Sequence, residues 1–290
     1  VMRDGHVVDR ALARERTPEQ LVGAMVGRER LTTIEAPPTP SGTIPVLQAR
    51  GVFATAQGAQ IRDVSFEMAA GEILGIAGVS GNGQYALAEA LAGLVPVTTG
   101  DIILGGESIA SRISDGVIAD EIAYIPERPL DNAVVADLDL GLNLTLRRLT
   151  KLPLFPQRRA ISGQAGDLIK RFDVRPPNPT LAAATLSGGN LQKLVIAREL
   201  SNAHRLVIAC YPTMGLDVLA AQAVYRALFE QAAAGACVVW ISEELDDLLA
   251  YAHRIAVIHG GSIAGIVRRQ DASRQTIGHW MAGAGRGAAA

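Results

Sequence analysis

The sequence predicts an α/β fold built on a mostly parallel sheet with helices on both faces. Three short, continuously apolar runs predict buried strands, because a strand covered on both faces shows no polar alternation. These runs are EILGIAG, LVIAC and CVVWI, at residues 72–78, 206–210 and 237–241. Helical stretches, such as the one around 220–234, separate strands in the chain, and this alternation is typical of parallel sheets.

Composition places the chain among globular proteins. It has 290 residues, of which 49% are hydrophobic and 19% charged, so it can build a core. Because 27 lysines and arginines are balanced by 29 acidic residues, no basic field favours nucleic acid as a partner. No stretch approaches the roughly 18 apolar residues of a membrane span, and the N-terminus lacks a signal-peptide plan, so we expect a cytoplasmic chain.

Several residues are expected to be structural. Cys210 and Cys237 lie in apolar runs without C-x-x-C spacing, which predicts buried, reduced thiols. Trp240 and Trp280 lie in apolar contexts and are expected in the core. The five histidines show no metal-binding spacing, so no metal site built from protein ligands is expected. Three basic pairs are interpreted as solvated faces: Arg147–Arg148, Arg158–Arg159 and Arg268–Arg269.

The two ends of the chain resemble each other at a constant offset. Each reads as a strand, a glycine turn, a second strand and a short helix, and the first helix begins at Thr17 and Pro18. We expect residues 1–30 to be the last piece of a preceding homologous domain, and the chain to be a C-terminal fragment of a longer polypeptide. Five pairs share the offset (257 − 1 = 256): Val1 and Val257, Gly5 and Gly261, Val7 and Ile263, Met25 and Met281, Gly27 and Gly283.

Proline composition marks a domain boundary. Residues 31–45 carry four prolines and no apolar period, which predicts a stiff linker. The main domain is expected over 46–284, with period-two alternation at 61–68 and a mostly helical insertion at 137–172. The small, uncapped tail at 285–290 is expected to be disordered.

A glycine loop follows the first buried run. Gly78 and Gly83 keep the spacing G-x-x-x-x-G between a strand and an apolar helix, which is typical of a phosphate-binding loop. The Lys and Ser or Thr that should follow are replaced by Gln84 and Tyr85, so both the charge for the outer phosphates and the magnesium-binding hydroxyl are missing. A tight turn without a ligand is the alternative interpretation.

A second glycine motif opens a later helix. Ser187 is placed as the N-cap, and Gly188 and Gly189 allow a phosphate to approach the exposed amides at the helix N-terminus. The whole motif comprises Leu186, Ser187, Gly188, Gly189 and Asn190.

With this LSGGN motif, the chain resembles the ATP-binding cassette (ABC) ATPases over residues 46–284, and most closely the C-terminal cassette of sugar and nucleoside importers with two fused cassettes. The resemblance implies a P-loop NTPase fold, with a mostly parallel central sheet, an antiparallel β part and a helical subdomain at about 128–184. It also implies that residues 1–30 are the tail of a first cassette.

The resemblance assigns roles to particular positions. Cys210 and Tyr211 stand where the family has Asp and Glu, Glu243 stands at the switch histidine, and Asp217 keeps the D-loop position. Phe53 is either an adenine-stacking aromatic or a core residue. The implied nucleotide-binding positions are Gly78, Ser80, Gly81, Asn82, Gly83, Gln84, Tyr85 and, at the family's Q-loop glutamine, Glu127.

The resemblance further implies a composite site for ATP with Mg²⁺, formed by the phosphate loop of the first cassette and the signature of this one. The implied partners are the first cassette, membrane permease subunits and, indirectly, a solute-binding protein, on the inner face of the cell membrane. We expect this chain's own site to be inactive, and a nucleoside is favoured over a sugar as the solute. The alternatives are a regulatory module that holds ATP without turnover, and an ABC protein working on DNA or ribosomes, for which a coiled-coil insertion or basic flank is lacking.

Overall fold

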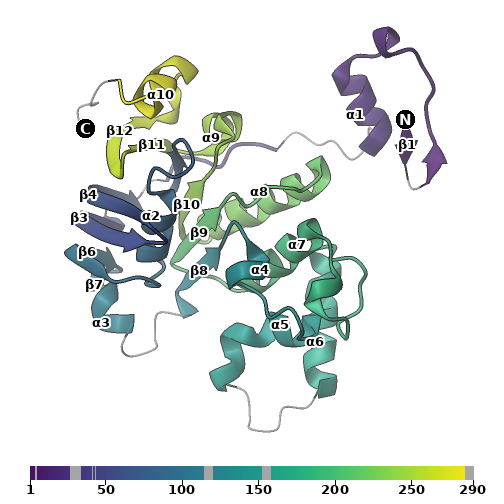
Figure 1. Ribbon diagram of the computed structural model, residues 1–290, viewed down its shortest axis with the longest axis horizontal. Helices are drawn as coiled ribbons and strands as arrows, with labels where there is room; N and C mark the ends of the chain where they lie inside the picture. Colours follow the sequence, from purple (N-terminus) through teal and green to yellow (C-terminus); the bar gives the residue numbers. More distant parts are fainter. Residues whose placement is uncertain are drawn as a thin grey trace.

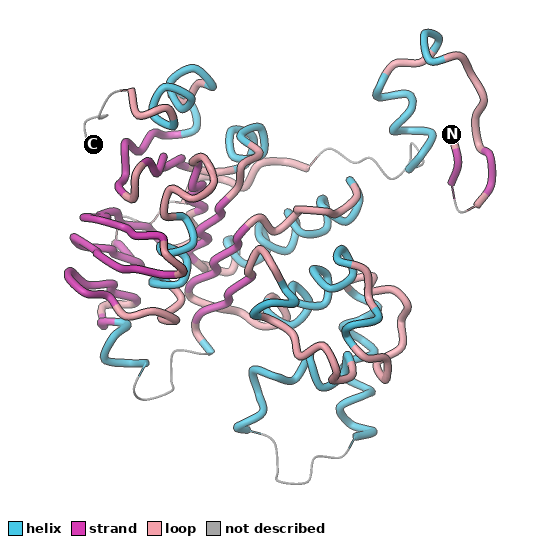
Figure 2. The backbone as a smooth tube through the Cα atoms, viewed as in Figure 1, coloured by secondary structure: helices cyan, strands magenta, loops and turns pink. Residues whose placement is uncertain are grey.

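The computed structural model describes most of the chain (Figures 1 and 2). The expectation about the tail at 285–290, the Gly27 pair of the repeat and part of the predicted linker lie outside the described residues. The described residues are 1–3, 5–26, 34–40, 42, 44–113, 120–151 and 158–284.

A six-stranded sheet forms the centre of the fold, and its parallel character confirms the prediction. The spatial order is β12-β11-β5-β10-β9-β8, with every pair parallel except β11 and β12. All residues of β5, β9 and β10 are buried, as continuous apolar runs require. The strands are β5 (Ile73–Ala77), β8 (Ile122–Ile125), β9 (Leu206–Cys210), β10 (Cys237–Ile241), β11 (Arg254–His259) and β12 (Ser262–Arg268).

Helices cover both faces of this sheet. Alternate strand residues such as Val207 and Trp240 pack with one group of helices, whereas Ile208 and Val239 face α2 and a second sheet. This division buries both cysteines as free thiols and Trp240 completely, as predicted, but Trp280 is only partly buried. The helices are α2 (Gln84–Leu91), α7 (Gly188–Glu199), α8 (Val218–Ala233), α9 (Leu245–Tyr251) and α10 (Arg274–Met281).

The second sheet is antiparallel and has the order β4-β3-β6-β7. From Val64 to Met68 buried and exposed residues alternate, as the period-two prediction requires, and Val64 and Phe66 face the core shared with α2. The alternation is interrupted at Arg62 and Asp63, which are both exposed; Asp63 has φ of 50°, and Ile61 before it lies in the same core. Its elements, with the helix that follows, are β3 (Pro45–Ala56), β4 (Ala59–Ala69), β6 (Val97–Leu104), β7 (Glu107–Ser108) and α3 (Ile109–Ile113).

The helical insertion lies to one side of the sheets (Figure 1), and its buried apolar residues form a core of their own. Leu140, Ile169 and Leu194, from three different helices, meet in it. The Asp139 side chain caps its second helix by accepting from the Leu142 amide at 2.7 Å. The insertion consists of α4 (Pro129–Asn132), α5 (Leu140–Thr145), a 3₁₀ turn (Leu146–Lys151) and α6 (Arg158–Arg171), followed by α7.

The N-terminal segment repeats the C-terminal architecture. It contains β1 (Met2–Arg3), β2 (His6–Val7) and α1 (Pro18–Val26). Its strand pair Met2–Val7 corresponds, 256 positions later (258 − 2), to the pair Ile258–Ile263.

The turns and helix starts of the two copies correspond as well. Gly5 and Gly261 have φ of 80° and 83°, a left-handed conformation that glycine adopts readily. Thr17 caps the first helix through the Gln20 amide at 3.3 Å, and Ser273 caps α10 through the Thr276 amide at 3.1 Å. The two ends therefore share register, turn and cap at one offset.

Candidate functional site

The carboxyl ends of four adjacent parallel strands bring the predicted residues together. The glycine loop follows β5, Glu127 follows β8, Cys210 ends β9, and Glu243 lies just after β10. Parallel strands place their carboxyl ends on one edge, where α/β proteins bind ligands.

The described part of the chain contains no helix long and apolar enough to cross a membrane.

Side chains of the glycine loop form hydrogen bonds with its own backbone. The Gln84 amide nitrogen donates to the Val79 carbonyl at 2.9 Å, and that of Asn82 donates to the same oxygen at 2.8 Å. Gln84 is buried, and a Cβ added at Gly78 would lie 2.7 Å from its amide nitrogen. Asn82 also accepts from the Gly260 amide at 2.7 Å, which ties the loop to the turn after β11.

Two tyrosines and two acidic residues surround the loop. Burial, and then the neighbouring Glu127 carboxylate, raise the pKa of Tyr85 to about 12. Burial and the nearby Glu243 carboxylate likewise raise the pKa of Tyr211 above its usual range. Tyr211 has φ of 47°, an uncommon conformation for a bulky residue, and its amide donates to the Ile241 carbonyl at 2.9 Å.

Tyr124 is a site residue that the sequence did not reveal. It lies on β8, and its hydroxyl is buried without a hydrogen-bond partner among the described residues. Burial, together with the neighbouring Cys210, raises its pKa above the usual range. It carries no motif, and only its place one residue before the end of β8 puts it near the edge where the glycine loop and Glu127 lie.

These residues do not fit a magnesium ion held on a phosphate group. Mg²⁺ prefers hard oxygen ligands, carboxylates in particular. Tyr85, Cys210 and Tyr211 have pKa values raised mainly by burial, so they stay protonated at neutral pH. A buried thiol and two phenols offer neither a carboxylate ligand nor a base for water. The two carboxylates nearby, Glu127 and Glu243, would repel the outer phosphates.

The LSGGN motif lies at the start of α7, on the helical insertion. Leu186 is buried, whereas Ser187 and Gly188 are exposed. Ser187 is the N-cap residue, as predicted, but its hydroxyl makes no capping bond to the helix backbone. Instead, it accepts from the Asn190 side chain at 3.0 Å, and the Asn190 oxygen accepts from the Arg175 amide at 2.8 Å.

Asp217 lies beside this motif. Its side chain caps α8 by accepting from the Ala220 amide at 2.9 Å. A Cβ added at Gly189 would lie 3.3 Å from the Gly215 carbonyl, which shows how close the two segments are. Asn190 and Asp217 line one cavity of about 580 Å³. Phe53 is half-buried on β3 between two buried residues.

The interpretation of Arg147 as part of a solvated face was wrong. Arg147 pairs with the buried Glu199 at the end of α7 and donates to the Ile122 carbonyl. Arg148 is exposed, so the two members of the pair differ.

A glycine loop between a buried parallel strand and a helix, at the carboxyl edge of such a sheet, defines a P-loop nucleotide-binding domain. The family model described as "ABC transporter" matches residues 61–214, and the chain belongs to this family.

The relatives are named as import ATP-binding proteins. The chain is 36% identical over 288 residues to the guanosine import ATP-binding protein NupO of Bacillus subtilis, covering 98% of this chain and 56% of that protein. It is 33% identical over 288 residues to the nucleoside import ATP-binding protein NupA of Lactococcus lactis, covering 98% and 57%. A putative ribose/galactose/methyl galactoside import ATP-binding protein of Burkholderia lata is 34% identical over 280 residues, covering 96% and 54%. The chain thus spans about half the length of these relatives.

Solved structures share the fold. The ATP-binding cassette MJ0796, in a dimeric post-hydrolysis state bound to ADP and Pi, matches with a TM-score of 0.67 at 18% identity, covering 77% of this chain and 98% of that one. An ATP-binding subunit of an ABC transporter matches with a TM-score of 0.66 at 24% identity, covering 84% and 95%. The predicted ABC cassette fold is confirmed.

Proposed function

We propose that this chain is the C-terminal half of an import ATPase for nucleosides or simple sugars, and that it supplies its LSGGN motif to an ATP site on a preceding cassette. The names of the relatives support the solute class, and their length, about twice the matched part, supports a second cassette. The shared register and caps of β1–β2–α1 and β11–β12–α10 support a homologous domain before this one.

The observation that carries the proposal is the contrast between two sites. The signature is intact, its Ser187 and Gly188 are exposed, and the serine hydroxyl accepts from Asn190 and does not cap the helix. In the chain's own loop the Gln84 side chain donates to the Val79 carbonyl, and the protonated hydroxyls of Tyr85 and Tyr211 lie nearby. ATP with Mg²⁺ therefore belongs to the composite site, in which Ser187 donates its hydroxyl proton and the Gly188 and Gly189 amides face the outer phosphates.

The chain's partners follow from this role. The preceding cassette supplies the phosphate loop and the attacking-water base, and permease subunits in the membrane receive the motion of closure. A solute-binding protein acts through the permease. The chain is then peripheral on the inner face of the cell membrane.

The experiment is to place Ser187→Arg in this chain and measure the ATPase rate with a complete first cassette present. The long cation fills the space for the phosphates, so the rate is expected to fall to background. Thr185→Arg, at an exposed position two residues earlier, is the matched control and is expected to leave the rate unchanged. An unchanged rate with Ser187→Arg would exclude the composite site.

A further inference from the structure

We propose that three charged residues, two at the end of α7 and one on the 3₁₀ turn after α5, position the signature motif relative to the loop that carries Glu127. The Glu199 cluster consists of Glu199, Arg147 and Arg198. This inference rests on the proposed function, because it concerns how the donated signature is moved.

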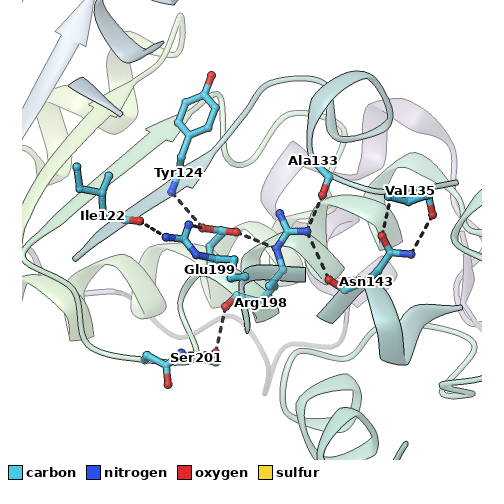
Figure 3. Close-up of polar contacts among 10 residues, drawn as sticks. Ile122, Tyr124, Ala133, Val135, Asn143, Arg198, Glu199 and Ser201 are labelled. Carbon is cyan, nitrogen blue, oxygen red and sulfur yellow. Dashed lines mark hydrogen bonds and ion pairs between the residues drawn. The ribbon is translucent and has the colours of Figure 1, made fainter. Parts of the chain in front are cut away.

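The cluster is a buried carboxylate between two guanidinium groups (Figure 3). The Glu199 side chain is 2% exposed, and those of Arg198 and Arg147 are 9% and 25% exposed. Glu199 accepts from Arg198 at 2.8 Å and also pairs with Arg147. Breaking such a pair leaves an uncompensated buried charge, so the three groups hold together as a unit.

The side chains of the cluster form hydrogen bonds with two different segments of the backbone. The Tyr124 amide donates to Glu199 at 3.2 Å, and Arg147 donates to the Ile122 carbonyl, so β8 is held at two points just before Glu127. Arg198 donates to the Ala133 carbonyl in the segment that leads into α5.

Asn143 extends this connection. It accepts from the Val135 amide at 2.8 Å and donates to the Val135 carbonyl at 3.0 Å, and its own carbonyl lies 3.5 Å from Arg198. The stretch from 133 to 143 is therefore fixed to α7 along with β8.

The signature lies at the opposite end of the same helix. α7 has 12 residues. At 1.5 Å per residue it is about 18 Å long, and a helix of this length transmits a displacement along its axis. A cavity of about 400 Å³, lined by Leu94, Leu146 and all three cluster residues, gives a segment of the permease access to the cluster. A shift there is carried through Glu199 to Ser187.

The test is Arg147→Lys in the assembled transporter, with a complete first cassette and the permease. Lysine keeps the charge, but a single ammonium cannot replace the two-nitrogen contact with Glu199 and Ile122. Arg254→Lys is the matched control, because Arg254, on β11 and far from β8 in the sheet order, pairs with buried Glu72 and donates to the Glu67 backbone carbonyl. The exposed fractions are similar, 27% and 8% for Arg254 and Glu72 against 25% and 2% for Arg147 and Glu199.

We expect both variants to lower the melting temperature to a similar extent. Only Arg147→Lys is expected to lower kcat for ATP at least fivefold and to reduce solute transported per ATP, with KM for ATP unchanged. Equal kcat and transport ratio in the two variants would overturn the inference while leaving the proposed function intact. A wild-type assembly without ATPase activity would overturn both.

Hydrogen exchange gives a second readout that does not depend on turnover. Binding of the permease is expected to change the exchange of the Gly188–Leu191 amides in the wild-type chain and in Arg254→Lys, but not in Arg147→Lys. The same change in all three chains would contradict the positioning role of the cluster.

Discussion

The amide nitrogen of Gln84 lies 2.9 Å from the carbonyl oxygen of Val79, within the glycine loop. This bond satisfies a buried polar side chain without any ligand, because Gln84 is only 3% exposed. A phosphate entering the loop would have to displace this neutral group and would gain no positive charge in return. Gln84 thus offers an incoming phosphate no charge-assisted contact.

Replacing Gln84 with lysine is expected to restore nucleotide binding without turnover. A charge-assisted contact is worth about 1.5–3 kcal/mol, which corresponds to a roughly ten- to hundredfold lower Kd for ATP. Calorimetric titration measures this change. Gln275→Lys, exposed on α10, is the control for added charge and is expected to change nothing. ATP hydrolysis by the Gln84→Lys chain without a first cassette would contradict this expectation, because it would mean that Cys210 and Tyr211 do not prevent hydrolysis.

Gly188→Ala tests the close approach of a phosphate to the signature. A Cβ at Gly188 meets no atom within 4 Å, so the free energy of unfolding is expected to change by less than about 0.5 kcal/mol. The ATPase rate with the first cassette is expected to fall at least tenfold, because the methyl group takes the space of the incoming phosphate. Gly163→Ala, in the interior of α6 and equally open, is expected to preserve the ATPase rate and to raise the free energy of unfolding by up to about 1 kcal/mol. Full activity in Gly188→Ala would place the phosphate elsewhere.

Gly78→Ala is expected to destabilise the fold. Its Cβ would lie 2.7 Å from the Gln84 amide nitrogen and from the Ile258 side chain and carbonyl, and overpacking of this kind costs about 1–3 kcal/mol. Urea unfolding measures the loss. Gly166→Ala, with open space around its Cβ, is the control and is expected to unfold at the wild-type urea concentration or above it.

His253 makes stability depend on pH. It accepts from the Ile73 amide through Nδ1 at 2.8 Å and donates through Nε2 to the Pro38 carbonyl at 3.0 Å, which requires the neutral ring. Burial lowers its pKa from 6.5, so the unfolded chain takes up a proton first. The free energy of unfolding is therefore expected to fall as the pH drops below about 6.5.

Urea unfolding at pH 7.5 and 5.5 measures this dependence. His253→Gln is expected to be less stable than wild type at pH 7.5 but to lose less stability between the two pH values. His204, whose pKa is also lowered by burial, contributes to the loss that remains. His279→Gln, at an exposed position, should lose as much as wild type. An equal loss in His253→Gln would contradict the role of this ring.

The features that depend on short sequence patterns were predicted. Continuous apolar runs gave the buried strands β5, β9 and β10, because their burial on both faces leaves no polar positions. Glycine spacing located the loop at Gly78 and the start of α7 at Gly188, because both positions are set by local geometry. Strand adjacency then brought the loop, Cys210 and Glu243 to one edge.

The features that depend on distant partners were not predicted. Arg147 looked solvated because its partner, Glu199, is 52 residues away and only the fold brings them together. Tyr124 carried no motif, and its isolated hydroxyl is visible only once β8 and β9 are paired. The Ser187 hydroxyl was expected to cap α7. Instead it accepts from the Asn190 side-chain amide at 3.0 Å, and the sequence alone does not show which of the two contacts forms.

We propose that this chain donates its signature motif to another cassette and does not hydrolyse ATP at its own loop. The most direct measurement is a calorimetric titration of Mg-ATP into the chain alone, followed by phosphate release with a complete first cassette added. We predict no tight binding and no release alone, and turnover once the cassette is present. Tight binding with phosphate release by the chain alone would contradict the account, because it would require a complete site around Gln84, Tyr85, Cys210 and Tyr211.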